Sequence, residues 1–318
     1  MELRNVTHRS PDGDKEQVLR FWSGEYAEAT RSRLEAPWGS ETYGLAAAFE
    51  AGRCIGTTSY TISPHRVGIL SQVFTDADHR GRGVGRATIS AAIATFRQQR
   101  TRAVYLASAK EWVRAIYRSV GFEFVGAMGE RHAFKLTLDE SGREEILFRP
   151  GQPVAQRALA THDQADLSAL FNSGHDCLVK HHELGCYLGS HFEGEFYQLR
   201  RLAKARPGFR AVILEGQETL LGLATVVPSA RRGETHRGVV DVLVRPGFAD
   251  HGGAMMAALH EDSALEVYTA YAGEGDALRC ALLEGAGYTV VGRLAGWLRF
   301  SDTSCDLLLF ERGRGAAT

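Results

Sequence analysis

The chain repeats one order of segments twice, and this repetition limits its fold more than any other feature. Residues 44–62 and 209–227 each contain two apolar stretches joined by a short glycine-containing turn, a pattern that predicts a β-hairpin. Gly56 and Gly222 begin the second stretch of each hairpin and lie 166 residues apart, as do Gly121 and Gly287 farther along. Equal spacing at two separate points predicts two copies of one α/β unit.

Both copies continue in the same way. A pattern typical of a helix start, with early acidic residues, precedes each hairpin, and a further strand follows it at residues 67–75 and 238–244. A turn with glycines and an alanine-rich amphipathic helix come next. We therefore predict one domain at residues 1–140, a linker or crossover strand at 141–153, and a second domain at 154–318.

Composition excludes several classes of protein. The 37 basic and 38 acidic side chains leave a net charge of -1, so we expect no nucleic-acid partner. No apolar stretch approaches the roughly 20 residues that cross a bilayer, so we expect no membrane partner. The first residues show no apolar leader, and the five cysteines form no CxxC pair, which predicts a cytoplasmic protein with free thiols.

A segment rich in histidine and cysteine, residues 174–195, superficially suggests a zinc site. It has neither a CxxC nor an HxxxH framework. We therefore expect no metal, and predict that the segment contacts substrate or the other domain.

The sharpest local feature is the sequence RGRGVGRA at residues 80–87, between a predicted strand and a predicted helix. Such glycines let backbone N–H groups converge at a helix N-terminus, where phosphate oxygens bind. The helix places an apolar stripe on the sheet, formed by Ile89, Ala92, Ile93 and Phe96. The turn is not GxGxxG, and no P-loop lysine follows it. The alternative is a tight turn whose glycines only relieve steric strain.

The hairpin, the Arg80-x-x-Gly83-x-Gly85 turn and a later Tyr117-x-x-x-Gly121-Phe122 element occur in an order that resembles the GNAT acyltransferase superfamily over roughly residues 1–138. The resemblance implies an α/β fold of two tandem GNAT domains, each a mixed, mostly antiparallel central sheet flanked by helices. It also implies acetyl-CoA as co-substrate, no metal, and a small-molecule amine as acceptor, and it leaves the oligomeric state open.

The resemblance assigns roles to particular residues. The pyrophosphate of acetyl-CoA is expected at the turn, on Arg80, Gly81, Arg82, Gly83, Val84, Gly85 and Arg86. The pantetheine arm is expected to pair with the end of the preceding strand, at Val73, Phe74 and Thr75. Tyr117 takes the place of the tyrosine that protonates the departing CoA thiolate, a transfer that the usual pKa values of about 10 and about 8.5 permit.

The sequence departs from the family pattern at several positions. Lys110 stands where many relatives have asparagine, and Ala77 replaces a common proline. The strand offers Ser71 and Gln72 where several relatives place a glutamate base. The amine can react as the free base, or a water relay can start from one of three other residues, Asp76, His79 or Glu111.

The aromatic and arginine side chains of residues 21–38 have two interpretations. They form the wall of an acceptor site, or they are helix core with solvated arginines; the set is Phe21, Trp22, Tyr26, Arg31, Arg33 and Trp38.

The second copy has lost part of both motifs. Ala249, Gly252 and Ala254 occupy the positions of Arg80 and the two motif glycines, and Leu283 occupies the tyrosine position. We therefore expect this copy to be catalytically silent. The resulting hypothesis is an N-acetyltransferase, an acyltransferase of groups other than aminoacyl groups. The alternatives are an acyltransferase with a carrier-protein or acyl-tRNA donor, and a non-catalytic acyl-CoA sensor or scaffold.

Overall fold

The computed structural model describes residues 1–108, 111–125, 133–174, 177–188, 192–261, 263–300 and 303–313. The chain forms two compact units, here called the first and second domains. The first contains Met1–Phe124, Ala133–Arg143 and Ala160–Ala169, and the second is built mainly from Glu144–Leu159 and Leu170–Thr318.

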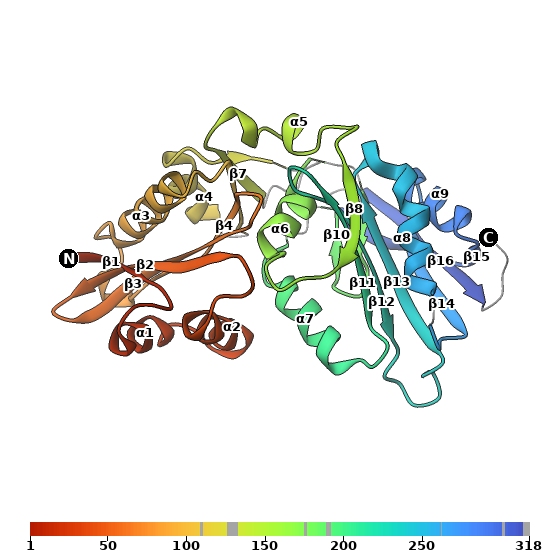
Figure 1. Ribbon diagram of the computed structural model, residues 1–318, viewed down its shortest axis with the longest axis horizontal. Helices are drawn as coiled ribbons and strands as arrows, with labels where there is room; N and C mark the ends of the chain where they lie inside the picture. The colour runs from red at the N-terminus through yellow and green to blue at the C-terminus, as the bar shows by residue number, and fades with distance from the viewer. Residues whose placement is uncertain are drawn as a thin grey trace. The chain divides into compact units, whose positions relative to one another are not determined.

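The first domain is a seven-stranded sheet with helices on both faces (Figure 1). Its strands lie in the order β1-β2-β3-β4-β5-β7-β6, and among the described strand pairs of this sheet β4 and β5 alone are parallel. In chain order its elements are β1 (Glu2–Val6), α1 (Asp12–Leu19), α2 (Gly24–Glu35), β2 (Thr42–Glu50), β3 (Arg53–Ile62), β4 (Val67–Thr75), the 3-10 turn Ala77–His79, α3 (Val84–Gln98), β5 (Ala103–Ala107), α4 (Glu111–Ser119), β6 (Glu123–Phe124), β7 (Ala133–Thr137) and a 3-10 turn at Glu140–Gly142.

Alternation along β2 explains why helices cover both faces of this sheet. Leu45, Ala47 and Phe49 pack with residues of α1 and α2, whereas Ala46 points to the opposite core, which α3 and α4 cover. Since both faces are buried, β2 and β3 are almost continuously apolar or uncharged.

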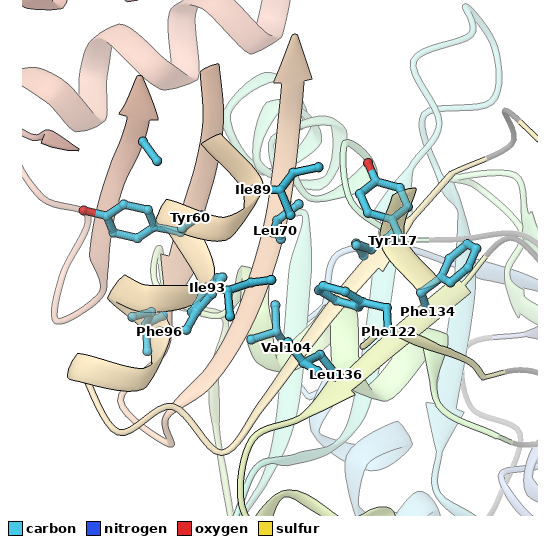
Figure 2. Close-up of a cluster of buried hydrophobic side chains, with 14 of the residues drawn as sticks. Tyr60, Leu70, Ile89, Ile93, Phe96, Val104, Tyr117, Phe122, Phe134 and Leu136 are labelled. Carbon is cyan, nitrogen blue, oxygen red and sulfur yellow. The ribbon is translucent and has the colours of Figure 1, made fainter. Parts of the chain in front are cut away.

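The core beneath α3 contains the predicted stripe. Ile89, Ala92, Ile93 and Phe96 are each at most 4% exposed and pack against the sheet, as Figure 2 shows for the three larger side chains. Burial of each Ile or Phe side chain contributes roughly 1.5–3 kcal/mol, so the stripe mounts α3 firmly on the sheet. The predicted amphipathic helix is confirmed.

The second domain repeats this topology. Its strands lie in the order β8-β11-β12-β13-β14-β16-β15, which matches the first sheet position by position. Its elements are β8 (Val154–Ala158), β9 (Val179–His181), β10 (Cys186–Tyr187), α7 (Glu195–Ala205), β11 (Arg210–Gly216), β12 (Leu220–Pro228), β13 (Arg237–Val244), the 3-10 segment Pro246–His251, α8 (Gly252–His260), β14 (Val267–Gly273), α9 (Ala277–Gly285), β15 (Thr289–Phe300) and β16 (Thr303–Gly313). The helix α6 (Gln164–Asn172) is divided between the two domains, because the first domain contains its residues up to Ala169. The predicted two copies of one α/β unit are confirmed, and the small β9–β10 sheet is an addition to the second copy.

The connection between the two sheets is helical. Residues 144–147 form the short helix α5 (Glu144–Leu147), so the predicted alternative of a crossover strand is not what forms there. Glu144 and Glu145 lie in the first turn of α5, where acidic side chains favour a helix.

Candidate functional site

Strands β4 and β5 pair through their first residues and then separate. Their parallel ladder runs from Val67–Ala103 to Ile69–Tyr105, after which β4 continues to Thr75 and β5 to Ala107. A β-bulge accompanies the separation, because the register against β3 shifts between the pairs Ser59–Ser71 and Thr57–Phe74. Bulges bend a strand, so the last residues of β4 turn away from β5.

The side chain of Gln72 holds the bulge. Gln72 has a φ of +50°, a strained value for a residue with a side chain, and is 6% exposed. Its amide donates to Thr30 Oγ1 at 2.8 Å, and its amide oxygen accepts from the Tyr43 hydroxyl at 3.1 Å. Ser71 is bound to Ser59 through their hydroxyls at 2.8 Å. Both residues at the family's base position are therefore engaged in hydrogen bonds inside the domain.

The glycine-containing turn lies directly beyond the end of β4. Gly81 and Gly83 have φ values of +74° and +80°, which residues with a Cβ rarely adopt, and Gly83 is the residue before α3. The first N–H groups of α3 have no acceptor within the helix, so they face the space in front of it. Arg80 Nε donates to the Thr75 carbonyl at 3.4 Å, which ties the turn to β4.

The turn also concentrates positive charge. Arg80, Arg82 and Arg86 are exposed around it, while Val84 is 3% exposed and packs on Ala48 and Ile55. Exposed guanidinium groups, free N–H groups and the positive end of α3 together favour an anion such as a pyrophosphate. The predicted anion site thus lies beyond the end of β4, where β4 and β5 have separated.

Tyr117 lies on the β5 side of the separated strands. It is 5% exposed, and its ring meets Phe122 and Phe134 at centroid distances of 6.0 and 5.7 Å. Phe134 pairs across strands with Leu106 of β5. Figure 2 shows the Tyr117 hydroxyl pointing away from Phe122 and Phe134. The ring is therefore core, and its hydroxyl points out of the aromatic cluster.

Comparison with known proteins agrees with this arrangement. Residues 12–122 match the family model described as the acetyltransferase (GNAT) family. The first domain belongs to the GNAT acetyltransferase family. No curated protein matches the chain.

Several solved structures resemble one half of the chain. They include an acetyltransferase of the GNAT family from Streptococcus pneumoniae, with 12% identity over 51% of this chain and 99% of that chain and a TM-score of 0.42. A ribosomal-protein-alanine N-acetyltransferase from Brucella melitensis shows 19% identity over 50% and 99%, with a TM-score of 0.41. The putative acetyltransferase yncA from Salmonella typhimurium, solved with acetyl-CoA, shows 16% identity over 50% and 93%, with a TM-score of 0.40.

The predicted bases of the GNAT domain are held by other side chains. Asp76 accepts from Arg20 and Arg53 at 2.9 Å each, and the hydrogen bond from Arg20 lowers the pKa of its carboxyl most. His79 lies 3.2 Å from Glu50. Lys110 and the side chain of Glu111 lie outside the described residues. A carboxylate stabilised in its charged form is a poor proton acceptor, so Asp76 is disfavoured as the base.

The aromatic residues near α1 contact β4 itself. Phe21 and Trp22 meet Phe74 with ring centroids 4.5 and 6.1 Å apart. They thus line the β4 side of the expected pantetheine path. The sequence alone did not place Phe21 and Trp22 beside the donor, because no local pattern connects residues 21–22 with residue 74.

The interpretation of residues 21–38 as helix core with solvated arginines is wrong for Arg33. This side chain is 1% exposed and bonds to Glu41 at 2.8 Å and to Gln164 at 2.6 Å. The predicted solvation does hold for Arg31, which is half-exposed in an ion pair with Glu16. A buried charge needs such partners, and the sequence carries no local sign of them.

In the second domain the side chain of Arg279 occupies the equivalent opening. The parallel ladder of β13 and β14 ends at Val240–Ala270, and beyond it the Arg279 guanidinium donates to the carbonyls of Val242 and Tyr271 at 2.6 Å each. Arg279 therefore bridges the two strands where they separate.

Asp241 completes this bridge. It pairs with Arg279 at 2.7 Å and with His181 at 3.1 Å, and it accepts the backbone N–H groups of His182 and Glu183 at 2.7 and 3.1 Å. Burial opposes its charge, but the side chains of His181 and Arg279 and the backbone N–H groups keep the pKa of the Asp241 carboxyl below its usual range. The β9–β10 sheet is thereby fastened against β13.

Two of the degenerate motif positions of the second copy, Gly252 and Leu283, are packed, whereas Ala254 is exposed. A Cβ at Gly252 would lie 2.3 Å from Leu282 Cδ2, and Leu283 is fully buried. Leu283, at the tyrosine position, therefore belongs to the core. Of the segment rich in histidine and cysteine, His175 and His191 lie outside the described residues, and His181 and His182 bond to Asp241 and Tyr187. Among the residues that the structure describes, no group of three His, Cys, Asp or Glu side chains could hold a metal, and no helix is long and apolar enough to cross a membrane.

Proposed function

We propose that the first domain transfers an acetyl group from acetyl-CoA to a primary amine of a small molecule. The observation that supports this most is the opening between β4 and β5, which ends at a glycine-containing turn and a helix N-terminus. The family match supports acyl transfer in general. The donor, the amine and the residue roles are the proposed parts.

The donor would occupy the opening as an extended chain. Its pantetheine amides would pair with the backbone of Val73, Phe74 and Thr75. They would do so along the edge of β4 that borders the opening, where β5 no longer pairs with it. Its pyrophosphate would lie at Gly81–Arg86, on the first N–H groups of α3 and the exposed arginines. Phe21 and Trp22, packed on Phe74, would shield the arm from water.

The chemistry then needs one attack and one proton donation. The amine, present in part as the free base, attacks the thioester carbonyl and forms the C–N bond, and its proton passes to water. As the C–S bond breaks, the Tyr117 hydroxyl donates its proton to the departing thiolate and regains one from solvent. Ser71 and Gln72 are bound to neighbours, so neither is needed as the base in this scheme.

Calorimetric titration of the full chain with acetyl-CoA is the first test. One site per chain is expected, because the opening of the second domain is filled by Arg279. Two sites would show that the second domain retains donor binding. No binding would refute acetyl-CoA as donor and favour a carrier-protein or acyl-tRNA donor.

A substitution of Tyr117 tests the chemical step. We expect Tyr117→Phe to keep the acetyl-CoA affinity and to lose about 10²-fold in the rate of CoA release, measured with amino sugars, amino acids and aliphatic amines as acceptors. Tyr60→Phe is the matched control, since Tyr60 belongs to the same core cluster and bonds to Asn5. Equal rates for Tyr117→Phe and the wild type would refute the general-acid role. Binding of acetyl-CoA without turnover of any amine would favour the sensor alternative.

A further inference from the structure

The second domain contains a cavity of about 490 Å³ that is separate from its filled strand opening. The cavity lies where β12 ends, where β13 begins at Arg237, and beside Tyr271 of β14. The start of β13 is the end remote from α8, since β13 runs toward α8. The volume is within the range of small-molecule sites.

Two arginines of the cavity wall each have an acidic partner. Arg237 pairs with Glu311, and Arg231 lies 4.0 Å from Glu234. These pairs leave the sum of their charges at zero.

Two other charges of the wall remain available. Arg206 and Glu183 both line the cavity, and within the described part of the chain neither side chain forms a hydrogen bond or an ion pair. The cavity thus presents one cationic and one anionic group, which attract each other electrostatically without a direct hydrogen bond, so each keeps its hydrogen-bonding atoms for a ligand.

Backbone hydrogen bonds fix the main chain at both of these residues. Arg206 ends α7, and its N–H donates to the Leu202 carbonyl at 2.9 Å. The N–H of Glu183 donates to the buried Asp241 at 3.1 Å. The network that closes the strand opening therefore also positions a wall of the cavity. The main chain of this wall is therefore fixed before a ligand binds, so that no loop must be ordered there on binding.

An aromatic surface lies beside the two charges. The rings of His182 and Tyr271 stack with centroids 3.6 Å apart and planes at 18°. His182 Nδ1 lies 3.0 Å from the Tyr187 hydroxyl, and burial lowers the pKa of His182, so this ring stays neutral at neutral pH. A flat neutral surface suits the apolar part of a ligand.

We propose that this cavity binds a small zwitterion of the size of a free amino acid, with its carboxylate at Arg206 and its ammonium group at Glu183. A planar guanidinium and a carboxylate each bind the opposite charge through directed hydrogen bonds, which discriminate against ligands that lack one of the two groups. The proposed site lies in the second domain and does not depend on the proposed transferase chemistry of the first.

Calorimetric titration of the full chain with each of the twenty common L-amino acids tests the proposal. At least one should bind, and its N-acetyl and carboxamide derivatives, which lack one charge each, should bind about tenfold more weakly or worse. Failure of all twenty to bind, or equal binding of the singly charged derivatives, would overturn the proposal.

Variants locate the site. Arg206→Gln and Glu183→Gln should each weaken binding about tenfold or more, whereas Arg232→Gln and Glu266→Gln should leave it unchanged. The control residues are exposed, lie near the cavity in the sequence, and do not line it. Binding that persists in both cavity variants would refute the location.

Acetyl-CoA affinity, measured on the same proteins, separates the two proposals. It should be unaltered in both cavity variants. Absence of amino-acid binding in the wild type would count against the cavity proposal only, and absence of acetyl-CoA binding in the wild type would count against the transferase proposal only.

Discussion

Substitution of Gly83 by alanine should separate the cost of backbone strain from the loss of donor binding. Gly83 has a φ of +80°, and Gly52, in the turn between β2 and β3, has a φ of +79°. A Cβ at either position would meet no atom within 4 Å. The two substitutions therefore impose the same conformational penalty without a steric clash, and only Gly83 borders the proposed phosphate site.

The expected magnitudes follow from this match. Alanine in the left-handed region costs about 1–2 kcal/mol, so both variants should lose about that much unfolding free energy. In Gly83→Ala the turn can relieve the strain only by rotating N–H groups at the start of α3. Loss of one charge-assisted hydrogen bond costs about 1.5–3 kcal/mol, which corresponds to an acetyl-CoA affinity about 10- to 100-fold lower.

Urea unfolding and calorimetric titration measure the two effects on the same samples. The expected pattern is equal destabilisation of Gly52→Ala and Gly83→Ala, with weaker acetyl-CoA binding in Gly83→Ala alone. Unchanged affinity in Gly83→Ala would refute the assignment of the pyrophosphate to this turn. Equal loss of affinity in both variants would show that strain spreads through the domain and that the turn has no special role.

Two further predictions concern stability. Glu41→Ala should lower the unfolding free energy of the first domain, measured in urea, by about 3–5 kcal/mol, because it leaves the buried Arg33 charge without its carboxylate. The control Glu16→Ala, which breaks an exposed ion pair, should cost under about 1 kcal/mol. Equal losses in the two variants would contradict this reasoning. Burial and the neighbouring Arg312 lower the pKa of His260 to about 4 from the usual 6.5. Unfolding therefore takes up a proton between these two pH values, and the unfolding free energy should fall as the pH drops from 6.5 to 4, less steeply in His260→Gln than in the wild type. Parallel pH profiles of the two proteins would count against this role of His260.

Local patterns predicted the elements of this protein well. The hairpins, the strand of residues 67–75 and the stripe of α3 form where hydrophobic periodicity and turn residues place them, since each depends on neighbours in sequence. The glycine-containing turn was predictable for the same reason, because left-handed conformation strongly favours glycine.

Contacts between residues far apart in the sequence could not be predicted from local patterns. The bulge at Gln72 depends on Thr30 and Tyr43, and the filled opening of the second domain depends on Arg279, Asp241 and His181. Asp241, within the otherwise apolar residues 238–244, was a visible hint that a buried charge would need partners.

The sequence by itself determined two copies of one α/β unit, the order of their elements, and a glycine-containing turn suited to an anion in the first copy. Only the tertiary structure decided which strand opening stays available and which is filled. The physical reason is that an opening between strands leaves backbone carbonyls without a ladder partner. In the second domain Arg279 satisfies such carbonyls at Val242 and Val179, which are 37 and 100 residues away along the chain, so no local pattern shows the contact.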